Sequence, residues 1–160
     1  MAAGSTLARK RVWLILVFAF IASIGIYGAL VCLLQQQRPA PPSPAVLSTL
    51  RPVLYLLAIA CLLASVGWMH GNTRNLPGGA FSPAAPPPLP APERFQTITV
   101  IALALAEACA IMGLVLFFLG ASAVEFARFA LGTVIVDALS ILPRGIRYWA
   151  AWERQSSLTS

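Results

Sequence analysis

The sequence has few of the side chains on which most enzyme active sites depend. Its 160 residues include five acidic residues and one histidine, and only 10% are charged. There is no HExxH motif, no glycine-rich phosphate loop and no serine, histidine and aspartate set for nucleophilic catalysis. His70 stands apart from the cysteines, histidines and carboxylates that a metal site requires. We therefore expect no metal, no cofactor and no catalytic activity.

Cysteine is also scarce. Cys32, Cys61 and Cys109 each lie in an apolar segment, and none belongs to a CxxC motif. Isolated cysteines in apolar surroundings behave as small hydrophobic side chains, whereas a membrane disulfide oxidoreductase needs a paired, accessible thiol. The pattern argues against thiol redox chemistry.

The chain is rich in long apolar runs. Hydrophobic residues make up 59% of it, more than a soluble domain of this length can bury. The runs predict an all-α membrane protein with four transmembrane helices, at about 12–34, 52–69, 97–119 and 124–142. Residues 1–160 would form a single membrane domain, with proline-rich linkers at 35–51 and 70–96 and an interfacial tail at 143–160.

Prolines and glycine suggest where these helices begin and end. Pro52 is predicted at the first turn of the second span, where its missing N–H is harmless, and Pro143 is predicted to end the fourth span. Residues 120–122 leave a very short turn, so the third and fourth spans should form an antiparallel hairpin. Near the start of the fourth span, Glu125 and Arg128 are spaced for an ion pair.

The net charge of +6 comes from basic residues that flank the apolar runs. Such flanking residues indicate membrane topology and contact with anionic headgroups, so we do not expect binding to nucleic acid. The N-terminus, the second linker and the tail hold more lysine and arginine than the other side, which predicts a multi-pass inner (plasma) membrane protein with both termini cytoplasmic. The tail mixes basic and aromatic side chains, a pattern typical of an interfacial anchor: Arg144, Arg147, Tyr148, Trp149 and Trp152.

Glu107 is the single ionisable residue of the third span and lies near its midpoint. A charged carboxylate at that depth costs several kcal/mol, so we expect Glu107 to be protonated, paired, or facing a wet cavity. Ala104 and Ala110 are predicted on the same helix face as Glu107. Small residues in the first and third spans are predicted to let helices approach closely: Ala102, Ala104, Ala106, Ala110, Gly113, Gly25 and Gly28.

Asp137, in the fourth span, is the second candidate site residue. In a tight hairpin, Glu107 lies about 13 residues before the turn and Asp137 about 17 after it, which places them roughly 6 Å apart in depth at 1.5 Å per residue. That separation suits a link through water. The sequence therefore supports the hypothesis that Glu107 binds or relays protons or ions, with Asp137 as a relay toward the cytoplasm.

The first and third spans share a short pattern. When Gly28 is aligned with Gly113, small residues match at 25 and 110, isoleucines match at 26 and 111, and Ala22 falls opposite Glu107. The alignment raises the hypothesis that the chain consists of two related hairpins, of which only the second keeps the acid.

The segment LALAEACAIMGLVLFFL around Glu107, together with Ile26-Tyr27-Gly28, resembles the carboxylate helix of the proteolipid, or c, subunit of rotary ATP synthases and ATPases. In that family the carboxylate binds and releases H⁺ or Na⁺ as a ring of subunits turns, and the resemblance implies this role for Glu107. The second and fourth spans lack the glycine repeat of the family's other helix. The whole chain also resembles short four-span bacterial membrane proteins of unassigned role.

Two alternatives stand beside proton or ion handling. One is a non-catalytic membrane scaffold or assembly factor, in which Glu107 is a protonated carboxyl bonded to a neighbouring helix or subunit. The other is a small proton-coupled multidrug transporter; such proteins also use one glutamate in an alanine-rich helix but place it in the first span, where this chain has Ala22. The expected partners are the lipid bilayer and either further copies of the chain or a larger membrane complex.

Overall fold

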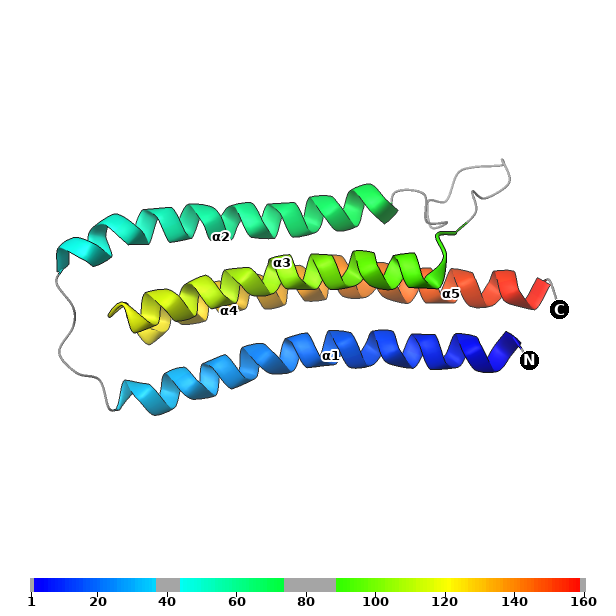
Figure 1. Ribbon diagram of the computed structural model, residues 1–160, viewed down its shortest axis with the longest axis horizontal. Coiled ribbons are helices and arrows are strands. Elements are labelled where there is room, and N and C mark those ends of the chain that lie inside the picture. The colour runs from blue at the N-terminus through cyan, green and yellow to red at the C-terminus, as the bar shows by residue number, and fades with distance from the viewer. Residues whose placement is uncertain (1, 37–43, 74–88, 159–160) are drawn as a thin grey trace.

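The computed structural model describes residues 2–36, 44–73 and 89–158, with side chains over 7–36, 47–73 and 89–155. These residues form α-helices and one π-helical turn: α1 (Ala2–Gln35), α2 (Pro44–Thr73), α3 (Pro92–Phe118), α4 (Ala123–Val136), η1 (Asp137–Ile141) and α5 (Leu142–Leu158) (Figure 1). Because α4, η1 and α5 follow one another without a break, they form one rod. Within the described residues, four helices are long and apolar enough to cross a membrane, which confirms the predicted all-α, four-span class.

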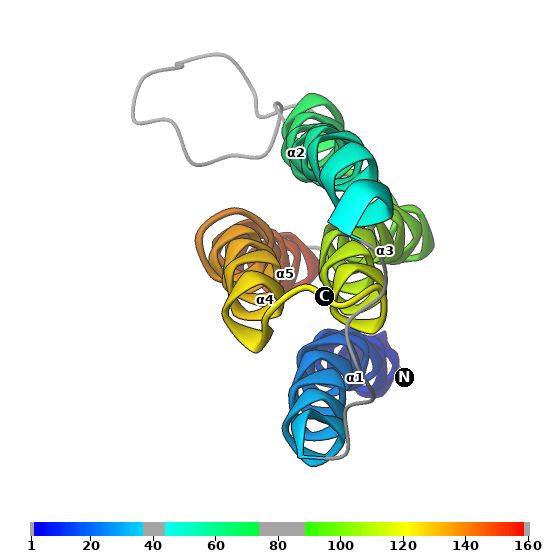
Figure 2. The same ribbon diagram turned by 90° about the vertical axis from the view of Figure 1, so that its left-hand side faces the viewer.

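Helix α3 is the centre of the bundle. It packs against α1, α2 and the α4–η1–α5 rod, while α1 and α2 lie on opposite sides of it (Figure 2). In its most apolar stretch 44% of the residues are buried, against 17% for α1 and for α2. The outer faces carry large exposed side chains such as Phe18, Leu56 and Leu139, which is the arrangement expected where helices face lipid.

The small residues of α3 allow this close packing. Ala102, Ala106 and Ala110 are completely buried, and Gly113 lies against α4. A Cβ atom at Gly113 would lie only 2.6 Å from the Cβ of Phe129, so glycine is needed for the contact. The predicted packing row along α3 is therefore present.

Three other predicted packing residues behave differently. Ala104 is exposed, because it lies two residues from Ala102 and Ala106 and so on the opposite side of α3. Among the described residues, no atom lies within 4 Å of a Cβ placed at Gly25, and at Gly28 the nearest atom is a ring carbon of Phe126 at 4.0 Å. The prediction that Ala104 and Gly25 line helix contacts was wrong.

Both chain ends lie at the same end of the bundle, which we call the terminal end; the α3–α4 turn marks the opposite, turn end (Figure 1). Two exposed ion pairs join helices at the terminal end, Arg9–Glu93 at 2.8 Å and Lys10–Glu153 at 2.7 Å. Exposed pairs of this kind contribute about 0–1 kcal/mol each, so they orient the helix ends more than they stabilise the fold.

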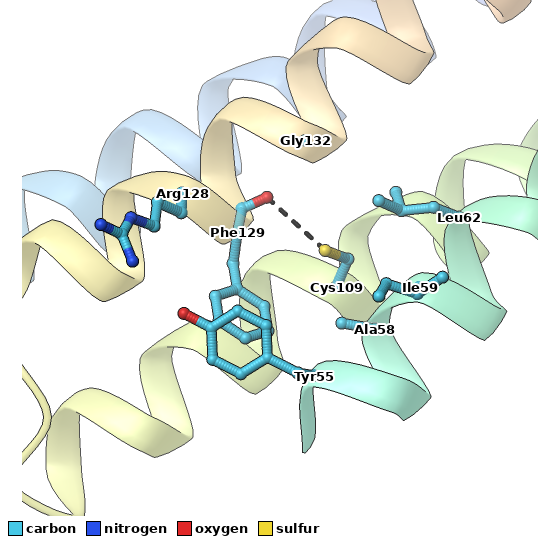
Figure 3. Close-up of a pocket in the computed structure, with 8 residues that line it drawn as sticks. All are labelled: Tyr55, Ala58, Ile59, Leu62, Cys109, Arg128, Phe129 and Gly132. Carbon is cyan, nitrogen blue, oxygen red and sulfur yellow. Dashed lines mark hydrogen bonds between the residues drawn. The ribbon is translucent and has the colours of Figure 1, made fainter. Parts of the chain in front are cut away.

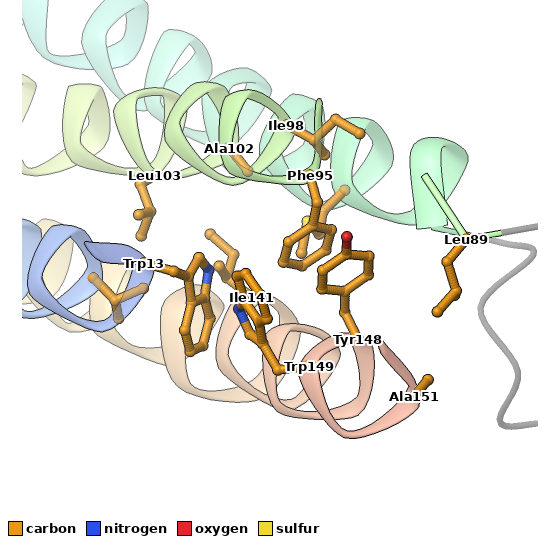
Figure 4. Close-up of a cluster of buried hydrophobic side chains, with 12 residues drawn as sticks. Trp13, Leu89, Phe95, Ile98, Ala102, Leu103, Ile141, Tyr148, Trp149 and Ala151 are labelled. Carbon is orange, nitrogen blue, oxygen red and sulfur yellow. The ribbon is translucent and has the colours of Figure 1, made fainter. Parts of the chain in front are cut away.

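An aromatic cluster forms the core of the terminal end (Figure 4). The rings of Phe95 and Tyr148 stack with centroids 3.7 Å apart, and the Tyr148 hydroxyl donates a hydrogen bond of 2.7 Å to the Pro90 carbonyl. Trp13 lies so close to Gly145 that a Cβ there would overlap its indole. Each ring therefore has a specific packing partner in the described bundle.

This cluster changes the interpretation of the predicted interfacial anchor. Tyr148 and Trp149 are 0% and 1% exposed, because the rod turns them inward, and Trp152 packs partly buried against them. Arg147 is exposed and Arg144 is half-buried. Tyr148 and Trp149 thus hold the bundle together from inside and do not form an outward-facing belt.

Pro143 does not end the fourth span. A proline removes one helical hydrogen bond and its ring crowds the carbonyl four residues earlier. The wider π-helical turn lies directly before Pro143, with the Leu142 N–H bonded to the Asp137 carbonyl, and the helix continues to Leu158. Pro52 likewise lies inside α2, which begins at Pro44 and not near residue 52. The described ends of both predicted linkers are thus partly helical, and residues 37–43 and 74–88 lie outside the described residues.

The predicted hairpin of the third and fourth spans is present. Gly120 has φ = 100°, a backbone conformation that favours glycine, and the Ser122 hydroxyl accepts a hydrogen bond from the Glu125 N–H to cap α4. The spacing predicted an ion pair between Glu125 and Arg128. Glu125 pairs instead with Arg51 of α2, at 3.0 Å. The pairing connects α2 to the start of α4.

Candidate functional site

Glu107 lies at the middle of α3 and its side chain faces α1. The Ser23 hydroxyl donates a hydrogen bond of 2.5 Å to Glu107 Oε1, and the Tyr27 hydroxyl donates one of 2.9 Å to the same oxygen. Ser23 and Tyr27 are four residues apart, so one face of α1 presents both hydroxyls together. All three residues are half-buried. The predicted candidate acid is thus the acceptor of a small interhelical cluster.

Ser23 makes a second contact that bears on the proton of Glu107. Its Oγ also lies 2.7 Å from the Phe20 carbonyl oxygen. A hydroxyl carries a single hydrogen, so it can donate to Glu107 or to Phe20 but not to both at once. When Ser23 donates to Phe20, its oxygen is free to accept a hydrogen bond from a protonated Glu107. Rotation of one hydroxyl therefore satisfies both the charged and the neutral carboxyl.

Glu107 also borders a hollow at the flank of the bundle. This open hollow of about 160 Å³ lies between α1 and α3 and is lined by Ala19, Phe20, Ser23 and Glu107. Oε2 of Glu107 has no hydrogen-bond partner among the described residues. A space of this size can hold water beside a carboxyl group. The carboxyl is thus hydrogen-bonded through Oε1, and its residue borders an open hollow.

Asp137, the predicted relay, is buried inside the bundle. Its side chain is 4% exposed, and its Oδ1 has no hydrogen-bond partner within the described part of the chain. It begins the π-helical turn, a type of distortion that often occurs at functional sites. Thr133, four residues before Asp137 on the same face of the rod, donates to the carbonyl of Ala106, the residue before Glu107, so the fold brings the two predicted acids into the same region.

Further hydroxyls surround this part of α3. The Ser65 hydroxyl of α2 donates to the Ala102 carbonyl at 2.7 Å, and the Thr133 hydroxyl of α4 donates to the Ala106 carbonyl at 2.9 Å. Ser23 and Tyr27 add two hydroxyls from α1. Each of the neighbouring helices α1, α2 and α4 therefore directs at least one hydroxyl at α3 between residues 102 and 107. The middle of an otherwise apolar bundle therefore carries a polar layer.

A second hollow, also about 160 Å³, lies on the opposite flank of α3 (Figure 3). In this apolar hollow the Cys109 thiol donates to the Phe129 carbonyl at 3.5 Å, and the rings of Tyr55 and Phe129 lie 4.6 Å apart. Arg128 is its one charged residue. The lining comprises Tyr55, Ala58, Ile59, Leu62, Cys109, Arg128, Phe129 and Gly132.

Sequence reasoning missed Ser23 and Tyr27 as partners of Glu107. Tyr27 belonged to the segment that carried the family resemblance, yet its hydrogen bond to Glu107 was not foreseen. The available signal was two hydroxyl side chains one helical turn apart in the first apolar span. Among the described residues, no group of three or more histidine, cysteine or acidic side chains is placed to hold a metal ion.

Comparisons with protein-family models, with curated proteins and with solved structures give no match. The function of the site therefore has to be inferred from its own geometry and chemistry.

Proposed function

We propose that this integral membrane protein binds and releases a proton, or a small cation such as Na⁺, at Glu107 and takes part in proton or ion transport. The observation that supports the proposal is the pair of hydroxyl groups on Oε1, one of which can reverse its hydrogen bond. A membrane-embedded carboxyl that only filled space would need no such second arrangement. The resemblance of this helix to the carboxylate helix of rotary c subunits points in the same direction.

The chemistry of the cluster suits reversible binding. An unpaired carboxylate in the hydrocarbon core costs several kcal/mol, which two donated hydrogen bonds reduce. Neutralisation by a proton removes the charge and leaves every hydrogen bond satisfied. The hydroxyl oxygens of Ser23 and Tyr27 beside Oε1 of Glu107 are also of the oxygen type that hard cations prefer.

The basic side chains support a cytoplasmic terminal end in a plasma membrane. Within the described residues, Arg51 and Arg128 lie toward the turn end, whereas the terminal end carries Arg9, Lys10, Arg11, Arg94, Arg144, Arg147 and Arg154. Cytoplasmic ends of membrane helices carry such an excess of lysine and arginine. Reporter fusions at both termini test this orientation.

Flux through proteoliposomes tests the function. The full-length protein is reconstituted, and H⁺ entry is followed with a trapped pH dye and Na⁺ entry with radioactive sodium. We expect Glu107→Gln to abolish the flux, because glutamine keeps an acceptor oxygen but cannot take up a proton. The matched control is Glu125→Gln, which removes an acid paired with Arg51 near the turn end and should leave the flux within about twofold. Unchanged flux in Glu107→Gln would overturn the proposal.

A scaffold or assembly function is the second candidate, and one observation favours it. α1 has a largely exposed apolar stretch, and the bonds from Ser23 and Tyr27 help to attach it to α3. A carboxyl used only for that attachment would support no flux. Recovery of the protein from native membranes in fixed ratio with a larger complex, without flux from the purified chain, would favour the scaffold.

A further inference from the structure

The buried polar side chains are unevenly distributed along the bundle. Those of the described residues lie between the depth of Glu107 and the terminal end: Ser65, Thr73, Thr99, Thr133, Asp137 and Ser140. From Glu107 to the turn end, the buried core is apolar and includes Val31, Leu116, Phe117 and Phe126. One half of the bundle therefore offers polar groups to a proton and the other half offers a hydrophobic seal.

Asp137 stands out within the polar half. The hydroxyls of Ser65, Thr73, Thr99 and Thr133 each donate to a backbone carbonyl, so their hydrogen bonds are satisfied. Asp137 has a buried oxygen, Oδ1, without a hydrogen-bond partner among the residues that the structure describes. A buried carboxyl in this condition must hold a proton or attract a cation or water, since leaving it charged and unpaired is costly.

A line of hydrogen bonds leads outward from the neighbourhood of Asp137. Ser140, three residues further along the rod, is buried, and its hydroxyl oxygen accepts a hydrogen bond of 2.7 Å from Arg144 Nη1. Arg144 Nη2 lies 3.1 Å from His70 Nδ1, and His70 is exposed in the last turns of α2. Because a guanidinium can only donate, Nδ1 is the acceptor of this hydrogen bond.

We infer that, in the conformation the structure describes, Glu107 exchanges protons with the terminal end, by way of Asp137, along a route lined by Ser140, Arg144 and His70. Transport across the membrane then requires a second conformation in which Glu107 is open to the turn end. The inference rests on the proposed function of Glu107. A proton from water at the terminal end binds the Asp137 carboxylate; Asp137 then releases it through water to the Glu107 carboxylate and becomes ionised again.

The route involves titratable or charged groups from every packed element. Asp137 and Arg144 belong to the rod, Glu107 to α3, Tyr27 to α1 and His70 to α2. Tyr27 is hydrogen-bonded to Glu107 and lies at the inner end of the route. His70 is hydrogen-bonded to Arg144 and lies at the outer end. Asp137 is the only one of the five that is fully buried, which makes it the step that controls passage.

Labelling of Glu107 with a hydrophobic carbodiimide, which reacts with protonated carboxyls, tests the inference. Full-length protein is captured in one orientation and reconstituted, so that the pH on each side is set separately, and the label at Glu107 is quantified by mass spectrometry. We expect the labelling rate to fall steeply when the terminal side is made alkaline and to respond much less to the pH of the turn side. Asp137→Asn should slow the response to a pH jump at least about tenfold, whereas Arg147→Gln, an exposed neighbouring charge, should not.

The outcomes separate the two proposals. Labelling that follows the pH of the turn side, or of both sides equally, would overturn the one-sided route while leaving Glu107 as a titrating site. Absence of labelling at any pH on either side would contradict the proposed function itself. The side-specific result for the unmodified protein does not depend on whether Asp137→Asn folds. A cooperative thermal unfolding transition shows that the Asp137→Asn variant is folded. If Glu107 labelling in the folded variant follows a pH jump as fast as in the wild type, the role of Asp137 is contradicted.

Discussion

The two hollows on α3 have the same size and opposite chemistry. Each has a volume of about 160 Å³; one contains Glu107 and the other Cys109, and the two residues lie two positions apart on opposite sides of the helix. On the α1 side, hydroxyls bond to a carboxyl. On the α2 and α4 side, aromatic and aliphatic side chains surround a thiol. The volume of a hollow therefore does not mark the candidate site; the polar groups that line it do.

The difference also shows two ways of attaching a helix to α3. α4 attaches by shape, because Gly113 leaves room for Phe129. α1 has a largely exposed apolar stretch and adds two hydrogen bonds to Glu107. Association of membrane helices relies on such close packing and interhelical hydrogen bonds, since lipid is as apolar as the side chains themselves.

Moving the acid from one hollow to the other should have the largest effect. In the double variant Glu107→Gln with Cys109→Glu, the carboxyl stays on α3 but loses Ser23 and Tyr27. We expect H⁺ or Na⁺ flux in proteoliposomes to stay at least about 100-fold below wild type, because the reversible hydroxyl is absent from the new position. Restored flux would show that any mid-membrane acid on α3 suffices.

The apolar hollow should not tolerate a carboxylate. Cys109→Asp places a charge at a position that is 2% exposed and faces the Phe129 carbonyl oxygen, which cannot donate a hydrogen bond. We expect a loss of about 3–5 kcal/mol in unfolding free energy, measured by denaturant unfolding in detergent at neutral pH. Cys109→Ala is the control and should cost much less. Equal stability of the Asp and Ala variants would contradict the contrast between the hollows.

Replacement of two glycines by alanine should change the stability of the protein in opposite directions. Gly113→Ala sets a methyl group 2.6 Å from the Phe129 Cβ and should destabilise the protein by about 1–3 kcal/mol. Gly25→Ala meets no atom within 4 Å and should stabilise α1 by about 0.5–1 kcal/mol, because alanine favours the helix. Midpoints of thermal unfolding in detergent give the order. Equal unfolding midpoints for Gly113→Ala and Gly25→Ala would show that α3 and α4 leave room for a methyl group at residue 113.

Removing single tyrosine hydroxyls should have the smallest effect. Tyr27→Phe removes one hydrogen bond to Glu107 and should cost about 0.5–1.5 kcal/mol of unfolding free energy. Tyr55→Phe, in the apolar hollow, removes a hydroxyl without a hydrogen bond in the described structure and should be nearly neutral. Denaturant unfolding of both variants in the same detergent measures the difference. A larger loss for Tyr55→Phe would reverse the comparison.

The sequence was sufficient for the number of apolar spans and for the tight hairpin, because apolar length and a glycine turn are local signals. The roles of Glu107 and Asp137 stay predictions. The partners of Glu107 were not accessible in the same way. Ser23 lies 84 residues from Glu107, and its contact depends on how α1 is rotated against α3. The inward turn of Tyr148 and Trp149 depends on a helix that continues through Pro143, which a proline rule alone predicts to stop.

Reversible protonation of Glu107 is the central claim, and infrared difference spectroscopy tests it most directly. Acid-minus-alkaline spectra of the reconstituted protein are recorded with Asp137→Asn as background, so that the second buried acid does not contribute. We predict a carbonyl band of a protonated carboxylic acid that appears on acidification and disappears when Glu107→Gln is added to this background. A spectrum that is the same with and without Glu107 would show that the carboxyl does not titrate, and would contradict the account.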